Sequence, residues 1–293
     1  MTAADTTHVD EWHGDDISIA EVQERLCEMR TTDGQSDLRT SVMTHTAWVP
    51  KHWLEAARGT LAGLAEAHPS RTIALVPDPE AGRDAIDATV SVYRFDLPGE
   101  TRRVFAEVVE LHLCGARASS PASIVEPLLI SDLPVFSRWR GRPAFGRQEL
   151  EQLLRVVDRM IVDSSEWEDL PADYALLAEC FDKAAISDIA FRRSLRWRAM
   201  LAELWPGIAD VNKVAVTGPK ADALLLAGWL RSRLDRKIAL EHEEADEIRS
   251  VSVDGEGVSA PRGEAPDPSQ QLSAELDQFG HDPIYEAAVR AAT

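Results

Sequence analysis

Short apolar runs rich in β-branched residues alternate along this sequence with longer segments whose apolar residues follow helical spacing. Residues 71–77 and 134–139 have the length and composition of strands, whereas residues 146–157 have the periodicity of an amphipathic helix. Strands that alternate with helices of about 12 residues or more are typical of α/β proteins. The sequence therefore predicts an α/β fold with a mixed, largely parallel sheet.

One pair of strands is expected to be antiparallel. The β-rich runs 88–96 and 103–113 are joined by a Pro98-Gly99 turn, which predicts a hairpin within the sheet. A terminal β-pair is predicted from residues 237–243 and 248–254. The remaining strands are expected at 40–49, 158–165 and 211–218, and the remaining helices at 17–30, 50–67, 119–130, 171–185, 190–205 and 219–235.

These elements divide into two predicted domains with flexible ends. Residues 17–165 are expected to form an N-terminal α/β domain, and residues 166–254 a smaller, helix-rich α/β domain. Residues 1–16 are predicted to be an acidic flexible arm. Residues 255–293 are predicted to be a mobile acidic tail with a short terminal helix, because Gly, Pro, Ser, Gln and acidic residues dominate its first part.

The net charge of −19 is concentrated at these two ends. Residues 1–33 hold nine acidic and two basic residues, and residues 241–286 hold thirteen acidic and two basic residues. The body between them, residues 34–240, is nearly balanced, with 28 acidic and 26 basic residues. Acidic ends repel phosphate backbones, so nucleic acid is not an expected partner.

Apolar runs and cysteines restrict the compartment. No run approaches the roughly 18–20 residues of a membrane span, so no membrane partner is expected. Cys27, Cys114 and Cys180 lie far apart and form no C-x-x-C pair, which argues against a zinc site, a redox dithiol and a disulfide framework. A reducing cytoplasm is therefore the expected location.

The turns that join strands to helices carry no complete catalytic motif. "VTGPKAD" (216–222) lacks the G-x-x-x-x-G-K-[ST] phosphate loop, and "IVDSSEWEDL" (161–170) lacks the G-x-S-x-G nucleophile turn. A dinucleotide-binding G-x-G-x-x-G is missing, and the histidines do not fall at metal-ligand spacing. The residues therefore carry no enzyme signature, and no catalytic, cofactor-binding or metal-binding residue is predicted from them.

Tryptophan and arginine stand out instead. Arg138, Trp139 and Arg140 lie in "RWRGR" (138–142), and Arg192, Arg196 and Trp197 lie in "RRSLRWR" (192–198). Both residue types are enriched among the contacts that dominate binding energy in protein interfaces. These six residues are therefore predicted to contact a protein partner. The alternative is that the tryptophans belong to the core and the arginines pair with nearby carboxylates.

Several strings of this sequence resemble those of a known family. "HPSR" (68–71), "PLLISDLPVFSRW" (127–139), "DRMIVDSS" (158–165) and "AGWLRSRL" (227–234) follow one another in this order, and residues 186–205 contain an Arg-x-x-x-Trp element. Over roughly residues 20–240, their order and spacing resemble the glucose-6-phosphate dehydrogenase assembly protein family, OpcA. The "SDLPV" and "DRMIVDSS" blocks together carry most of the specificity.

The resemblance implies a non-catalytic, chaperone-like partner and allosteric effector. Such a protein binds glucose-6-phosphate dehydrogenase, the enzyme that opens the oxidative pentose phosphate pathway, promotes its active oligomer and needs no cofactor. The residues leave one alternative of another class. In that alternative, an enzyme or sensor binds a small anionic ligand, a sugar phosphate or a nucleotide, at the strand ends near Asp163–Ser165 and Thr217–Lys220.

Overall fold

A computed structural model describes residues 8–31, 41–67, 70–96, 103–263 and 266–293. The chain divides into two compact units, Met1–Met160 and Ile161–Thr293, whereas the sequence analysis expected a boundary after residue 165. Asp163 and Ser164, which precede that expected boundary, hydrogen-bond to Arg193 and Tyr174 of the second unit. Within the described ranges, no helix is long and apolar enough to cross a membrane.

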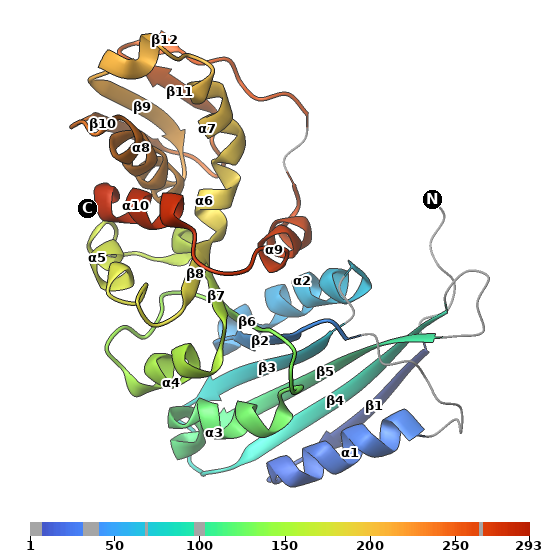
Figure 1. Cartoon of the computed structure of the whole chain (residues 1–293). Helices are drawn as coiled ribbons and strands as arrows, with labels where there is room; N and C mark the ends of the chain where they lie inside the picture. Colours follow the sequence, from blue (N-terminus) through green and yellow to red (C-terminus); the bar gives the residue numbers. More distant parts are fainter. Residues whose placement is uncertain (1–7, 32–40, 68–69, 97–102, 264–265) are drawn as a thin grey trace. The chain divides into compact units, whose positions relative to one another are not determined.

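The larger sheet confirms the predicted mixed, largely parallel α/β architecture. Its eight strands follow the order β1-β4-β5-β3-β2-β6-β7-β8 (Figure 1). The pairs β2–β3, β2–β6 and β3–β5 are parallel, whereas β1–β4 and the predicted hairpin β4–β5 are antiparallel. The predicted turn at residues 98–99 lies outside the described residues. The strands are β1 His8–Gly14, β2 Thr44–Trp48, β3 Arg71–Asp78, β4 Ile86–Asp96, β5 Arg103–Cys114, β6 Val135–Trp139, β7 Arg159–Val162 and β8 Ala185–Asp188.

Helices cover both faces of this sheet in the first unit. Helices α1 (Ile19–Thr31) and α3 (Pro121–Val125) lie on one face, and α2 (Leu54–Ala67) lies on the other (Figure 1). All five residues of β2 and of β6 are buried, as expected for parallel strands between two helical layers. The remaining helical segments are α4 (Gln148–Val156) and the 3₁₀ turns Lys51–Trp53, Gly115–Ser119 and Glu126–Leu128.

The N-terminal segment corrects one expectation. Residues 8–14, which the sequence analysis assigned to a flexible arm, form β1 and pair with β4 over seven residues. Polar side chains reinforce the pairing: His13 Nδ1 lies 2.9 Å from Thr89 Oγ1, and the Ser91 hydroxyl donates to Glu11. The ladder satisfies backbone groups that β4 would otherwise expose at its edge, which is why an acidic segment is ordered here. Residues 1–7 of the predicted arm lie outside the described residues.

The second unit has a four-stranded sheet of its own, in the order β10-β9-β11-β12. Its strands are β9 Lys213–Gly218, β10 Ala239–Glu244, β11 Ser250–Val253 and β12 Glu256–Gly257. The predicted pairing of 237–243 with 248–254 is wrong, because β9 lies between β10 and β11 and pairs with both. Val214 and Val216 of β9 are buried, so this strand takes the central position that the more polar β10 could not fill.

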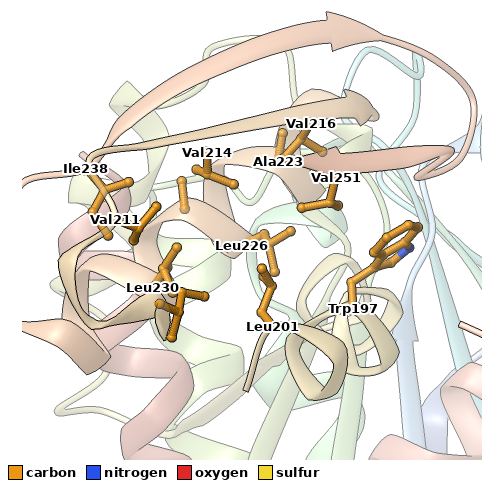
Figure 2. Packing of buried hydrophobic residues seen from close by; sticks show 12 residues of the cluster. Trp197, Leu201, Val211, Val214, Val216, Ala223, Leu226, Leu230, Ile238 and Val251 are labelled. Atoms are coloured by element: carbon orange, nitrogen blue, oxygen red, sulfur yellow. The ribbon is translucent and has the colours of Figure 1, made fainter. Parts of the chain in front are cut away.

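Helices α7 (Leu195–Ala202) and α8 (Lys220–Leu234) pack against this sheet around a continuous apolar core (Figure 2). Trp197 and Leu201 of α7 meet Leu226 and Leu230 of α8, and Val251 of β11 packs against them. The unit also contains α5 (Ala172–Ala178), α6 (Ile189–Arg193) and the 3₁₀ turns Ser164–Glu166 and Gly207–Asp210. The predicted helix 171–185 is too long, because its last residue begins β8.

The C-terminal segment corrects the expectation of a mobile tail. Residues 268–276 form α9 (Pro268–Leu276) and residues 283–292 form α10 (Pro283–Ala292). Asp267 and Asp282 cap the two helices by accepting backbone hydrogen bonds, and Tyr285 and Val289 of α10 are buried. The predicted short terminal helix is present as α10, whereas the polar composition up to residue 280 concealed α9. Both helices bury apolar side chains in the second unit.

We expect Gly228→Ala to destabilise the protein by about 1–3 kcal/mol, because α8 and α10 pack without room for another methyl group. A Cβ atom at Gly228 would lie 2.2 Å from the carbonyl oxygen of Ala288. Gly59→Ala in α2 is the matched control, since its Cβ would meet nothing within 4 Å. It should stabilise the protein by about 0.5–1 kcal/mol through helix propensity. Urea unfolding measures both changes, and equal stability of the two variants would contradict the prediction.

Candidate functional site

The first predicted contact group lies at the carboxyl end of β6. The Trp139 ring stacks on the Trp48 ring of β2, with centroids 4.9 Å apart and planes inclined by 17°. Trp139 is 2% exposed, and the buried Arg138 side chain donates to the carbonyl oxygen of Trp139. Trp139 therefore faces the core, which corrects the expectation that its ring is available to a partner.

Arg140 is the member of this group that reaches the surface. Its guanidinium lies 4.4 Å from the centroid of the Trp53 ring, and its backbone N–H donates to the carbonyl oxygen of Trp48. Both Arg140 and Trp53 are half-buried. They lie beyond the carboxyl ends of the adjacent parallel strands β2 and β6, where open α/β sheets commonly bind other molecules. This cation–π pair is the part of the first group that is accessible at the surface.

The second predicted group holds parts of the second unit together. Arg192 of α6 forms an ion pair with the buried Glu275 of α9 at 2.9 Å and donates to the Ala274 carbonyl oxygen. Arg196 of α7 donates to the carbonyl oxygens of Arg262 and Gly263, the latter at 3.0 Å. The two arginines therefore fasten α9 and the residues at 262–263 to α6 and α7.

Trp197, the third member of the second group, belongs to the core. Its side chain is 6% exposed and packs with Leu201, Leu226 and Val251 (Figure 2). The sequence analysis therefore assigned contact roles to two tryptophans that the structure buries. Three of the six predicted residues lie in each unit. Arg192, Arg196 and Trp197, the three in the second unit, line the same cavity.

This cavity lies within the second unit and has a volume of about 600 Å³. It is bounded by α6 and α7, by the residues that precede β11, by residues 260–263, and by α9. Arg193 and Asp222 also line it. Volumes of about 300–1,000 Å³ are typical of sites for small organic ligands.

Arg193 forms a buried charge cluster that the sequence analysis did not find. Its guanidinium donates to both oxygens of Asp163, at 2.9 and 3.1 Å, and to both oxygens of Asp222, at 3.0 and 2.9 Å. Burial alone would lower the pKa of Arg193, but Asp163 and Asp222 raise it above its usual value. Burial raises the pKa of the Asp222 carboxyl to about 6, although Arg193 acts in the opposite direction.

A third buried carboxylate lies beside this cluster. Asp188 Oδ1 accepts the N–H groups of Ser164 and Ala190, at 3.1 and 2.8 Å, and the Tyr285 hydroxyl oxygen lies 3.5 Å from Asp188 Oδ2. Burial, with the nearby negative charge of Asp163, raises the pKa of Asp188 to about 7.

The serines of this region are engaged in structural hydrogen bonds. Ser164 is fully buried, and its hydroxyl lies 2.9 Å from the hydroxyl of Tyr174. The Ser165 hydroxyl donates to Asp163 Oδ1 at 2.6 Å. Neither serine is placed against a histidine base, as nucleophilic catalysis by serine requires. Across the described ranges, no group of three or more His, Cys, Asp or Glu side chains could hold a metal ion.

The turn after β9 is also filled by the protein's own groups. The Thr217 hydroxyl donates to Glu243 and accepts from the Ser250 hydroxyl, while His242 hydrogen-bonds to the Gly218 carbonyl oxygen. A Cβ atom at Gly218 would lie 2.9 Å from Ile248 Cα. Together with the Arg193 bonds at Asp163, these contacts occupy the two strand ends at which the sequence analysis placed an anionic ligand.

The chain is similar to two protein families and to OpcA proteins of cyanobacteria, all of which have related descriptions. Residues 62–179 match the family described as glucose-6-phosphate dehydrogenase subunit N-terminal domain, and residues 184–266 match the corresponding C-terminal domain. The OxPP cycle protein OpcA of Nostoc punctiforme is 27% identical over 214 residues, which cover 67% of this chain and 46% of that protein. OpcA of Synechococcus elongatus is 26% identical over 245 residues, which cover 78% and 55%. The chain spans about half the length of these curated relatives.

We expect Arg193→Met to destabilise the protein by about 3–5 kcal/mol, because it leaves two buried carboxylates without their cation. Arg233→Met is the matched control, since Arg233 is an exposed residue of α8 and the change should stay within about 0.5 kcal/mol. Urea unfolding at pH 7.5 measures both. A loss for Arg193→Met no larger than that of the control would mean that the cluster contributes little to stability.

We expect Asp188→Asn to flatten the dependence of stability on pH. The pKa of Asp188 rises from 3.8 to about 7 on folding, so the native state holds a proton that the unfolded chain releases. Stability therefore falls as pH rises through this interval, and Asp222 adds a smaller effect of the same sign. The amide keeps the Oδ1 acceptor and carries no charge. At pH 8 the melting temperature of the variant should exceed that of the wild type by at least about 2–4 °C.

Asp246→Asn is the control for that measurement, because Asp246 is exposed. Melting temperatures are compared at intervals between pH 5 and pH 8.5. The control should follow the wild-type profile throughout. A profile for Asp188→Asn parallel to that of the wild type would show that Asp188 keeps an ordinary pKa in the folded protein.

Proposed function

Since this chain belongs to the OpcA family, we propose that it binds glucose-6-phosphate dehydrogenase and promotes the active oligomer of that enzyme. The observation that carries the proposal is the pair of family matches, which follow one another over residues 62–179 and 184–266. Both matched families are described as domains of a glucose-6-phosphate dehydrogenase subunit. The motifs around residues 127–139 and 158–165 led to the same family.

The arrangement of polar groups supports a role without catalysis. The carboxylates with raised pKa values, Asp188 and Asp222, are 2% and 1% exposed, and each is hydrogen-bonded inside the second unit. A catalytic acid or base has to reach the atom from which it takes a proton. Asp188 and Asp222 make their hydrogen bonds to the protein's own groups instead.

An assembly factor acts by differential binding. It shifts the dehydrogenase toward the active oligomer only if it binds that state more tightly than the inactive state. A coupling free energy of about 1–3 kcal/mol would change the ratio of active to inactive enzyme by about 5- to 150-fold. This is within the range that one well-formed protein interface supplies.

Trp205 is the strongest candidate contact in the second unit. It follows α7 and is 65% exposed, and its neighbour Leu204 is 41% exposed. Tryptophan is enriched among the interface residues that dominate binding energy. Arg140, Arg192 and Arg196 remain candidates from the sequence, whereas Arg138 is buried. Substitution of Arg192 or Arg196 would also release α9 or residues 262–263.

The proposal predicts that this chain and the cognate dehydrogenase co-elute from a size-exclusion column. Dehydrogenase activity should rise severalfold or more in the mixture, and the active oligomer should become the main species. The dehydrogenase alone and the chain alone are the controls. The proposal is overturned if the two proteins elute separately and the activity does not change. Turnover of glucose 6-phosphate by this chain alone would indicate an enzyme instead.

Trp205→Ala should weaken the complex by about tenfold or more, because loss of an interface tryptophan commonly costs 2 kcal/mol or more. Phe279→Ala is the matched control, an equally exposed aromatic side chain of the same unit at 68%. It should bind as the wild type does, and the melting temperatures of both variants should be unchanged. Equal affinities for both variants would place the interface elsewhere, while co-elution of the wild type would still support the assembly function.

A further inference from the structure

Several apolar side chains that line the cavity beside α6 and α7 are partly exposed to solvent. Leu195 at the start of α7 is 45% exposed, and Ile248 and Pro261 are half-buried. All three line the cavity of about 600 Å³. Apolar side chains in a concave site are the usual contacts of a ring system, because a planar ring buries a large area there without losing much conformational freedom.

The arginines at the base of the cavity are already paired with carboxylates of the protein. Arg193 and Asp222 line this base, but the guanidinium is bound by both Asp163 and Asp222. Arg192 is likewise held by the buried Glu275. An anionic ligand group has nothing to gain at this base, because it would compete with carboxylates that are already in place.

Positive charge at the rim is more accessible. Arg249 lines the cavity and is exposed, and it takes part in none of the ion pairs found among the described residues. Arg196, also at the rim, hydrogen-bonds to the carbonyl oxygens of residues 262 and 263, which carry no net charge. Glu247 is an acidic residue of the same lining, so the rim has a cationic side and an anionic side.

We propose that this cavity binds an organic anion with a planar ring system. The rings pack against Leu195, Ile248 and Pro261, and the acidic group lies at the rim beside Arg249. An aromatic acid and a nucleotide share this chemistry. The site is separate from the predicted ligand positions at the strand ends, which the protein's own side chains fill. The inference does not depend on the assembly function, since it concerns this chain alone.

Two fluorescent probes with the same rings test the proposal on the full chain. 8-Anilinonaphthalene-1-sulfonate carries one negative charge, and N-phenyl-1-naphthylamine is its neutral analogue. We expect the sulfonate to bind saturably with one site per chain. Arg249→Glu should weaken its binding by about tenfold or more, because one charge-assisted contact becomes a repulsion. The same variant should change the affinity for the neutral probe by less than about twofold.

Matched variants keep the test independent of general surface binding. Arg233 is an exposed residue of α8 outside the cavity lining. Arg233→Glu makes the same charge change there and should alter neither affinity. Leu195→Asn should weaken both probes, whereas Leu204→Asn, an equally exposed leucine outside the lining, should weaken neither. Circular dichroism and melting temperature confirm that each variant is folded. The proposal is overturned if the sulfonate does not saturate, or if Arg249→Glu and Arg233→Glu weaken it equally.

Discussion

The bidentate contacts of Arg193 with Asp163 and Asp222 hold three elements of the second unit in place. Asp163 follows β7, Asp222 lies in the first turn of α8, and Arg193 ends α6. Removal of charged groups from water is costly, and the cost is offset only when each group finds partners of good geometry. Two carboxylates for one guanidinium leave an excess of negative charge. The raised pKa of Asp188 follows from burial together with that excess.

The same cluster explains why the C-terminal helix is part of the core. Asp188 lies 3.5 Å from the Tyr285 hydroxyl of α10, and the Tyr285 ring packs against Phe181 and Phe191. Helix α10 also contacts α8 so closely that Gly228 has no space for a side chain. The polar network and the apolar packing therefore both hold α10 against the core of the second unit. An acidic composition does not prevent this, because the acidic residues cap α9 and α10, remain exposed or, in the case of the buried Glu275, form an ion pair with Arg192.

Local patterns in the sequence were sufficient for most of the fold but not for the charge cluster. The β4–β5 hairpin, the buried strands β3 and β6, and the unit formed by β9 and α8 follow from periodicity, turn residues and propensity, which act over a few neighbouring positions. Strand β8 was hidden because Ala185–Asp188 has only four residues at the end of a helical pattern. The partners of Arg193 lie about 30 positions away in both directions, so no local spacing could identify them. The one local signal was Asp222, an acidic residue within the apolar run of α8.

Closure of the strand ends determines where the second unit can meet another molecule. Arg193 fills the position after β7, and Thr217, His242 and Glu243 fill the position after β9. The outer side of α7 is therefore the surface that we propose for the protein partner, and the cavity next to it is the site that we propose for a small ligand. Arg192 and Arg196 fasten α9 and residues 262–263 to this side, which makes the surface rigid. An effector that selects one state of its partner benefits from such rigidity, because ordering of a loose surface on binding would consume the free energy that distinguishes the two states.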